Sequence, residues 1–163
     1  MFVTINRTAD EDRLRGCIGY PYPIQGLGTA LIKAAIGASC KDPRFPPLRR
    51  EELQSVLVEV SVLTAPELVR VDLPSALPSM IRVGVDGLIV TSAGGSGLLL
   101  PQVASEFQLD AERFLSSACL KAGLSSDAWL APDTIVHRFQ AEVFSESSPG
   151  GEVGSTSEGG VRS

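Results

Sequence analysis

The chain has 163 residues, of which 44% are hydrophobic and 20% are charged, and its formal net charge is −5. This size and composition are those of a single globular domain, and the acidic balance argues against a general nucleic-acid binder, which neutralises phosphates with Lys and Arg. No apolar run is long enough to span a bilayer, and residues 1–12 contain no signal-peptide core. Three widely spaced cysteines are typical of reduced thiols in a cytoplasmic protein.

The first part of the chain predicts a β-hairpin followed by a helix. Phe2–Asn6 and Leu14–Tyr20 have the composition of strands, and the polar stretch between them favours a turn. In Leu27–Cys40, apolar residues recur at helical spacing, and the alanines among them would let this helix lie close to a sheet. The proline-rich segment Asp42–Pro47 should end the helix and form a rigid loop.

The middle of the chain predicts further strands and two helical pieces. Val56–Thr64 is the clearest strand, because its valines alternate on one face. Leu88–Ser92 and Leu98–Leu100 flank a glycine-rich stretch that is typical of a hairpin. Two helical pieces follow, beginning near Pro101 and Asp110.

The last part of the chain predicts one more strand, Ile135–Phe144, and a tail. Residues 147–163 are rich in Gly, Ser and Glu and have no apolar period, so they should be disordered. Because hairpins and helices are mixed without regular βαβ alternation, residues 1–146 predict an α+β fold. We expect a single compact domain with an antiparallel or mixed β-sheet and helices packed on it.

Leu14–Tyr20, with the sequence LRGCIGY, carries most of the recognisable chemistry. Side chains alternate along a strand, so Arg15 and Cys17 are predicted to share a face. A guanidinium beside a thiol would favour the thiolate, which is the nucleophilic form. Catalytic cysteines generally need a base, and the single histidine, His137, is predicted to pack in the core. Cys17 therefore has two interpretations, a reactive thiol and a small buried hydrophobe.

Glu59 and Ser61 should face the same side of their strand, between two leucines. A partly buried carboxylate needs a partner, and Arg15 is the obvious candidate if the two strands are neighbours. One interpretation is a structural ion pair within the sheet. The other is a small ligand-binding pocket of Arg15, Gly16, Cys17, Glu59 and Ser61, in which perturbed protonation would be expected.

Two further residues are candidates for ligand binding. Arg44 lies in the proline-stiffened loop, where an arginine suits capture of a phosphate or carboxylate, although such charges more often form a solvated edge. Gln102 follows the proline at a predicted helix start, and its amide has no structural assignment. One histidine and three scattered cysteines give no metal-ligand spacing, and the sequence indicates no cofactor.

Five motifs occur in the order LRGCIGY, KDPRFPPL (Lys41–Leu48), VEVSVLT (Val58–Thr64), VGVDGLIV (Val83–Val90) and GLLLPQVA (Gly97–Ala104). With them the chain resembles the AMME chromosomal-region candidate family, which is named for a human contiguous-gene-deletion syndrome. The resemblance runs from Phe2 to about Glu146 and places Cys17 in the signature motif. Family members usually carry a helical leader before the first strand, and this chain is expected to lack it.

The resemblance implies partners rather than a reaction. Prokaryotic members are often encoded beside, or fused to, a Memo-like protein and a radical S-adenosylmethionine enzyme. Our first hypothesis is a partner or substrate-presenting component of a macromolecular modification system with these proteins. The second is an enzyme with Cys17 as nucleophile or transient carrier, and the third is a nucleotide- or RNA-binding module that uses Arg15 and Arg44.

Overall fold

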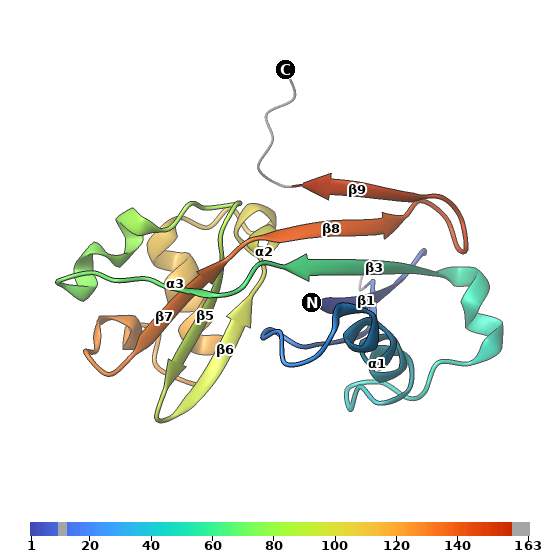
Figure 1. Cartoon of the computed structure of the whole chain (residues 1–163), viewed down its shortest axis with the longest axis horizontal. Helices are drawn as coiled ribbons and strands as arrows, with labels where there is room; N and C mark the ends of the chain where they lie inside the picture. Colours follow the sequence, from blue (N-terminus) through green and yellow to red (C-terminus); the bar gives the residue numbers. More distant parts are fainter. Residues whose placement is uncertain (10–12, 158–163) are drawn as a thin grey trace, which may run out of the picture. The chain divides into compact units, whose positions relative to one another are not determined.

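A computed structural model describes residues 1–9 and 13–157, which form two compact units. Unit 1 comprises residues 1–63 and 142–157, and unit 2 comprises residues 64–141. Each unit has its own antiparallel sheet with helices against it (Figure 1). The predicted α+β class is confirmed, with the strands distributed over two sheets rather than one.

The sheet of unit 1 has five strands in the order β2-β1-β3-β8-β9. Their bounds are β1 Phe2–Arg7, β2 Leu14–Gly19, β3 Val56–Leu63, β8 Ala141–Glu146 and β9 Val153–Ser157. The predicted helix is confirmed as α1, Leu27–Cys40, which packs on β1 and β2. A short 3-10 helix, η1 (Arg50–Ser55), leads from the proline-rich loop into β3.

Small residues set the position of α1 against the sheet. The buried residues of the helix are Ala30, Ala34, Gly37 and Ala38. A Cβ on Gly16 of β2 would collide with the carbonyl oxygen of Ala38. A Cβ on Gly37 would come within 2.8 Å of the Cγ2 of Ile18. Glycine on both sides therefore lets the helix and the edge of the sheet approach more closely than any other residue would permit.

Unit 2 has a four-stranded sheet in the order β4-β7-β5-β6. Its elements are β4 Glu67–Leu68, η2 Pro74–Met80, β5 Gly87–Ser92, β6 Gly95–Leu99, α2 Pro101–Glu106, α3 Ala111–Lys121, η3 Ala128–Leu130 and β7 Ile135–Phe139. The helix α3 packs on β5 and β6, and Phe114, Leu115 and Cys119 on its inner side are fully buried. The predicted glycine-rich hairpin is confirmed as the β5–β6 pair.

Two predicted strands are interrupted where the chain passes between the sheets. The strand predicted as Ile135–Phe144 is in fact β7 followed by β8, with Gln140 between them. The strand predicted to end at Thr64 ends one residue earlier. The backbone N–H of Thr64 donates to the Gln140 carbonyl at 2.9 Å, and the Gln140 N–H donates to the Thr64 hydroxyl at 2.9 Å. Apolar alternation continues across residue 140 without Pro or Gly, so the sequence contains no sign of this break.

The prediction of a disordered tail is wrong for residues 153–157. These residues form β9, which pairs antiparallel with β8 from Glu142↔Ser157 to Glu146↔Val153. Backbone hydrogen bonds to a free strand edge require no apolar side chains, which is why composition did not reveal this strand. The rest of the predicted tail, residues 158–163, lies outside the described residues. Among the residues described, no helix combines the length and apolar character needed to cross a membrane.

Replacing Gly16 by Ala should destabilise unit 1 by about 1–3 kcal/mol, because the added methyl group overlaps the backbone of α1. Gly28→Ala is the matched control, since nothing lies within 4 Å of its Cβ position in the first turn of the same helix. That change should be neutral or stabilise by up to about 1 kcal/mol. Urea unfolding of both variants measures the difference, and equal stabilities would contradict the close approach.

Candidate functional site at the Cys17 edge of the sheet

A β-bulge separates the side chains of Arg15 and Cys17. The pairing of β2 with β1 skips the residue between Gly16 and Leu14, and that residue is Arg15. A bulge inserts one residue and breaks the alternation of faces. The prediction that Arg15 and Cys17 share a face assumed a regular strand, and the bulge removes its basis.

The side chain of Arg15 is 4% exposed and binds elements that follow α1. Its Nε donates to Oε1 of Glu52 at 2.8 Å, and its Nη2 donates to Oε2 at 3.1 Å. Its Nη1 and Nη2 also donate to the carbonyls of Pro46 and Pro47, at 2.9 and 3.4 Å. The expected ion pair of Arg15 with Glu59 is therefore corrected to one with Glu52.

The Arg15–Glu52 pair shifts the protonation of both partners. Hydrogen bonds from the Arg15 guanidinium, and then from the backbone N–H of Arg49, lower the pKa of Glu52 to about 2. The same pairing raises the pKa of Arg15. Both groups are therefore charged at neutral pH, and Glu52 is a poor proton acceptor there. An open pocket of about 600 Å³ adjoins the pair, and its charged lining is completed by Arg7, Arg49 and Glu51.

A second ion pair binds the backbone of Cys17. β2 is an edge strand, so the outward N–H and carbonyl of this residue have no neighbouring strand. Oδ2 of Asp42 accepts from the Cys17 N–H at 2.9 Å, and Nη2 of Arg44 donates to the Cys17 carbonyl at 3.3 Å. Arg44 also donates to both carboxylate oxygens of Asp42, at 2.9 and 2.7 Å. Two loop residues thus satisfy the edge at Cys17.

The two partners of this second ion pair differ in their exposure to solvent. The Asp42 side chain is 2% exposed, whereas that of Arg44 is 50% exposed. Hydrogen bonds from the Arg44 side chain, helped by the Cys17 N–H, hold the pKa of Asp42 well below its usual value despite burial. The guanidinium of Arg44 also lies 5.5 Å from the centroid of the Phe45 ring. Arg44 stays a candidate for ligand binding only through the part of its guanidinium that faces solvent.

The thiol of Cys17 is half-buried, and the hydroxyl of Thr4 donates to its Sγ at 3.4 Å. Thr4 lies opposite Cys17 on one side and opposite Glu59 on the other. Directly opposed residues point to the same face of a sheet, so these three residues form one row across β2, β1 and β3. In the next row Ser61 lies opposite Phe2, and its buried Oγ has no hydrogen-bond partner in the part of the chain that the structure describes.

Of the predicted pocket, the structure therefore brings together Cys17, Glu59 and Ser61 on one face and removes Arg15. Gly16 serves the packing of α1. Sequence reasoning missed Thr4, Asp42 and Glu52. The acid in KDPRF was a usable signal for Asp42, because a lone acid among cations in a rigid loop suggests an ion pair. Within the described chain, no group of three His, Cys, Asp or Glu side chains is arranged to hold a metal ion.

The remaining candidates belong to unit 2. Gln102 lies in α2, and its Oε1 is buried without a hydrogen-bond partner among the described residues. His137 is half-buried in β7, opposite Ile89 of β5, and its Nδ1 is likewise without a partner there. The structure assigns neither side chain a bonded role, so the ligand-binding role of Gln102 stays a prediction.

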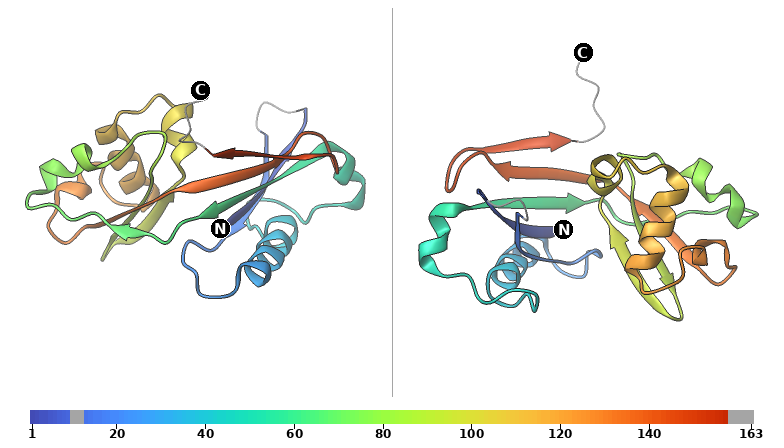
Figure 2. Two further views of the ribbon diagram at one scale, coloured as in Figure 1. Left: turned by 45° about the horizontal axis from the view of Figure 1, so that its top comes forward. Right: turned by 180° about the vertical axis from the view of Figure 1, so that it is seen from behind.

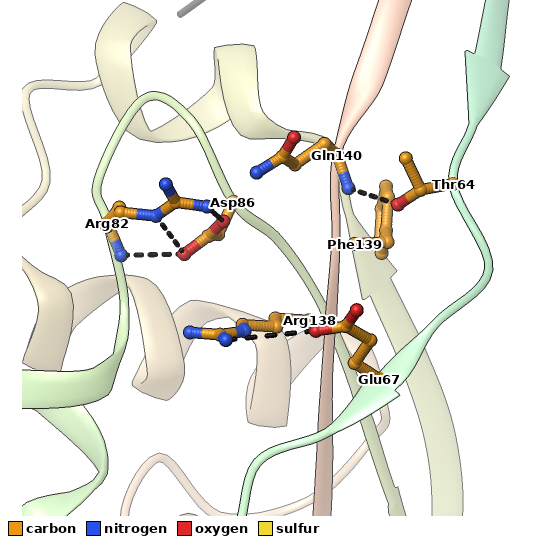
Figure 3. Close-up of a pocket in the computed structure, with 7 residues that line it drawn as sticks. All are labelled: Thr64, Glu67, Arg82, Asp86, Arg138, Phe139 and Gln140. Carbon is orange, nitrogen blue, oxygen red and sulfur yellow. Dashed lines mark hydrogen bonds and ion pairs between the residues drawn. The ribbon is translucent and has the colours of Figure 1, made fainter.

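Unit 2 also has a polar pocket of about 140 Å³, shown in Figure 3. It is lined by Thr64, Glu67, Arg82, Asp86, Arg138, Phe139 and Gln140. The fully buried Asp86 accepts from Nη2 of Arg82 at 3.0 Å and from the Arg82 backbone N–H at 2.9 Å. Arg138 donates to the Met80 carbonyl at 3.0 Å and lies 3.7 Å from Glu67. Each arginine is thus already matched with a carboxylate, as at the Cys17 edge.

The family model AMMECR1 matches residues 1–144 of this chain. The chain belongs to the AMMECR1 family. A protein of Methanothermobacter thermautotrophicus is 56% identical over 146 residues, which cover 90% of this chain and 74% of that protein. Protein TK0174 of Thermococcus kodakarensis is 54% identical over 155 residues, covering 94% and 75%. The crystal structure of uncharacterised protein PH0010 from Pyrococcus horikoshii matches with a TM-score of 0.91 and 51% identity, over 96% of this chain and 77% of that one.

In this AMMECR1 chain, Arg15→Met should destabilise by about 2–4 kcal/mol, because Glu52 and the proline carbonyls lose their donors. Combining it with Glu52→Gln should recover part of that loss, since the uncompensated charge is gone. Urea unfolding of the parent, both single variants and the double variant at neutral pH gives the coupling energy. Strictly additive losses would show that the two side chains do not interact.

The same pair predicts a pH dependence. Folding lowers the pKa of Glu52 from 4.5 to about 2, so the ionised carboxylate contributes stability that is fully present above the higher value. This contribution is lost as the pH falls toward the lower one. The stability difference between the parent and Glu52→Gln should therefore shrink between those two pH values, measured by urea unfolding. A difference that stays constant with pH would contradict the pairing.

Asp42→Asn should loosen the edge of the sheet at Cys17. Hydrogen bonds to charged groups contribute about 1.5–3 kcal/mol, so the amide proton of Cys17 should exchange at least about tenfold faster. Asp72→Asn, a change at an exposed aspartate of unit 2, is the control. Hydrogen exchange resolved at Cys17 decides the matter, and an unchanged rate would mean that Asp42 does not protect this amide.

Proposed function

We propose that this protein is a non-catalytic partner or substrate-presenting component of a cytoplasmic macromolecular modification system, together with a Memo-like protein and a radical S-adenosylmethionine enzyme. The observation that carries the proposal is the pairing of the charged groups around Cys17. Arg15 is bonded to Glu52, and Arg44 is bonded to Asp42. General acid–base catalysis needs a group whose pKa lies near the working pH, and both of these carboxyls have pKa values far below it.

The surroundings of the thiol support the same conclusion. The Cys17 thiol is hydrogen-bonded by the hydroxyl of Thr4, which donates to the sulfur. Nucleophilic activation requires a base that takes the proton from the thiol. A hydrogen-bond donor can stabilise the thiolate but cannot accept that proton. The signature residues therefore support a structural edge that presents Cys17 and its row more than a catalytic centre.

An enzyme with Cys17 as nucleophile or transient carrier is the second candidate. It is favoured by the same Thr4 contact and by the position of the Arg44 guanidinium at the Cys17 carbonyl. This candidate predicts that iodoacetamide labels Cys17 faster than Cys40, although Cys40 is the more exposed thiol. Slower labelling of Cys17 would remove its support.

The proposal is tested by mixing the full-length protein with the Memo-like protein and the radical enzyme of its own host. We expect a complex by size-exclusion chromatography with light scattering, and Cys17→Ser should bind as the parent does, because the thiol is not at the centre of the proposed role. If the complex forms but modification of a macromolecular substrate stops in Cys17→Ser, the enzyme candidate is correct. If neither enzyme binds the parent, the proposal is wrong.

A further inference from the structure

Several large apolar side chains of α1 are exposed rather than packed on the sheet. We call Leu27, Leu31, Ile32 and Ile36 the outer face of α1. Ile32 and Ile36 are 63% and 50% exposed, and Leu31 is 38% exposed. Leu27, the first residue of the helix, is 57% exposed, and Ile24 in the loop before it is 76% exposed. Figure 2, in its left view, shows α1 against the strands of unit 1 with its far side turned away from them.

The large apolar residues of α1 are exposed, although folding of unit 1 does not need them at those positions. The inner side of α1 is made of alanine and glycine, and these residues supply its contacts with the sheet. A surface helix of a globular protein normally has charged or polar residues on the opposite side. Here Leu27, Leu31, Ile32 and Ile36 recur at helical spacing on solvent-exposed positions. A contiguous exposed apolar surface of this kind is characteristic of an interaction site.

The charges on α1 and directly after it are positive. Lys33 is the charged residue of the helix, Lys41 follows its last residue, and both are exposed. The next charged residue, Asp42, is buried and paired with Arg44. The protein as a whole carries a net charge of −5. The segment that presents the outer face is therefore locally cationic in an acidic protein.

We infer that the outer face of α1 is the docking surface for an amphipathic helix of a partner protein whose apolar stripe is flanked by Glu or Asp. An amphipathic helix presents aliphatic anchors at spacings that match such a stripe, and acidic flanks are complementary to Lys33 and Lys41. The inference rests on the proposed function, because it names the chemistry by which a partner would be recognised.

Two other occupants fit the observations less well. A helix that lies on an anionic membrane is rich in Lys or Arg on its polar side and in Trp or Phe on its apolar side, whereas α1 contains one lysine, Lys33, and no aromatic residue. A second copy of this chain would bring the same cationic border against itself across a two-fold axis. Like charges that meet in this way oppose association.

The test uses a fluorescent amphipathic helical peptide with leucines on one side and glutamates beside them, and a matched peptide with lysines in place of the glutamates. The full chain should bind the glutamate peptide at least about tenfold more tightly than the lysine peptide, and added salt should reduce this difference. Ile32→Ser combined with Ile36→Ser should weaken binding at least about tenfold, because the central apolar contacts are lost. Leu120→Ser, a control at a residue of α3 that is 61% exposed, should change nothing.

A second variant keeps the test informative if the Ile32/Ile36 double variant does not fold. Lys33→Glu combined with Lys41→Glu leaves the apolar residues in place and should reverse the preference toward the lysine peptide. Equal affinity of the parent for the two peptides would overturn the inference. Binding to vesicles of phosphatidylserine and phosphatidylcholine without binding to either peptide would also overturn it. So would a dimer of the parent that the Ile32 and Ile36 changes dissociate.

The outcome is separable from that of the proposed function. If the Memo-like protein or the radical enzyme binds the parent and the Ile32/Ile36 variant equally, the proposed function stands and this inference is wrong. If the glutamate peptide binds as expected but neither enzyme does, the inference stands and the named partners are wrong.

Discussion

The structure of unit 1 depends on how the free edge of β2 is satisfied at Cys17. The outward backbone groups of an edge strand need partners, and here Asp42 and Arg44 provide them. The loop that carries these two residues has the complementary problem, because its prolines have carbonyls but no N–H groups to pair among themselves. Arg15, displaced by the bulge in the same strand, donates to the carbonyls of Pro46 and Pro47. Each of the LRGCIG and KDPRFPP motifs therefore supplies side chains that bond the backbone of the other.

This reciprocity bears on how a conspicuous motif should be interpreted. An arginine two residues from a cysteine suggests an activated thiol, but its guanidinium is used to join a strand, a loop and η1 through Glu52. Ion pairs of this kind hold both partners in their charged forms, so they fix geometry and are unsuited to proton transfer. What the motif leaves available is the half-buried thiol of Cys17 in a row with Thr4 and Glu59. Such a row can present a side chain without activating it.

The sequence was sufficient for elements with a clear period and insufficient where a single residue changed the register. The first hairpin and α1 were predicted because apolar spacing extends over many residues. The ion pair of Arg15 with Glu52 joins residues 37 positions apart through a bulge that no composition signals. The break at Gln140 and the strand β9 were not predicted from the sequence for a related reason. Both depend on backbone hydrogen bonds rather than on a side-chain pattern. Family motifs identified the important residues but not their partners.

The two sides of α1 are subject to different constraints. Its inner side must be small, because Gly16 brings the sheet to the backbone of the helix. Its end is tied to the proline-rich loop, where the Leu48 N–H donates to the Ser39 carbonyl at 2.7 Å. That loop in turn holds the Cys17 backbone through Asp42. Gly16 and Ile18, the neighbours of Cys17 in β2, both contact α1. Because side chains alternate along a strand, Cys17 and its row lie on the opposite face of the sheet. The helix and the thiol are therefore joined by one framework of backbone contacts but face opposite sides of unit 1.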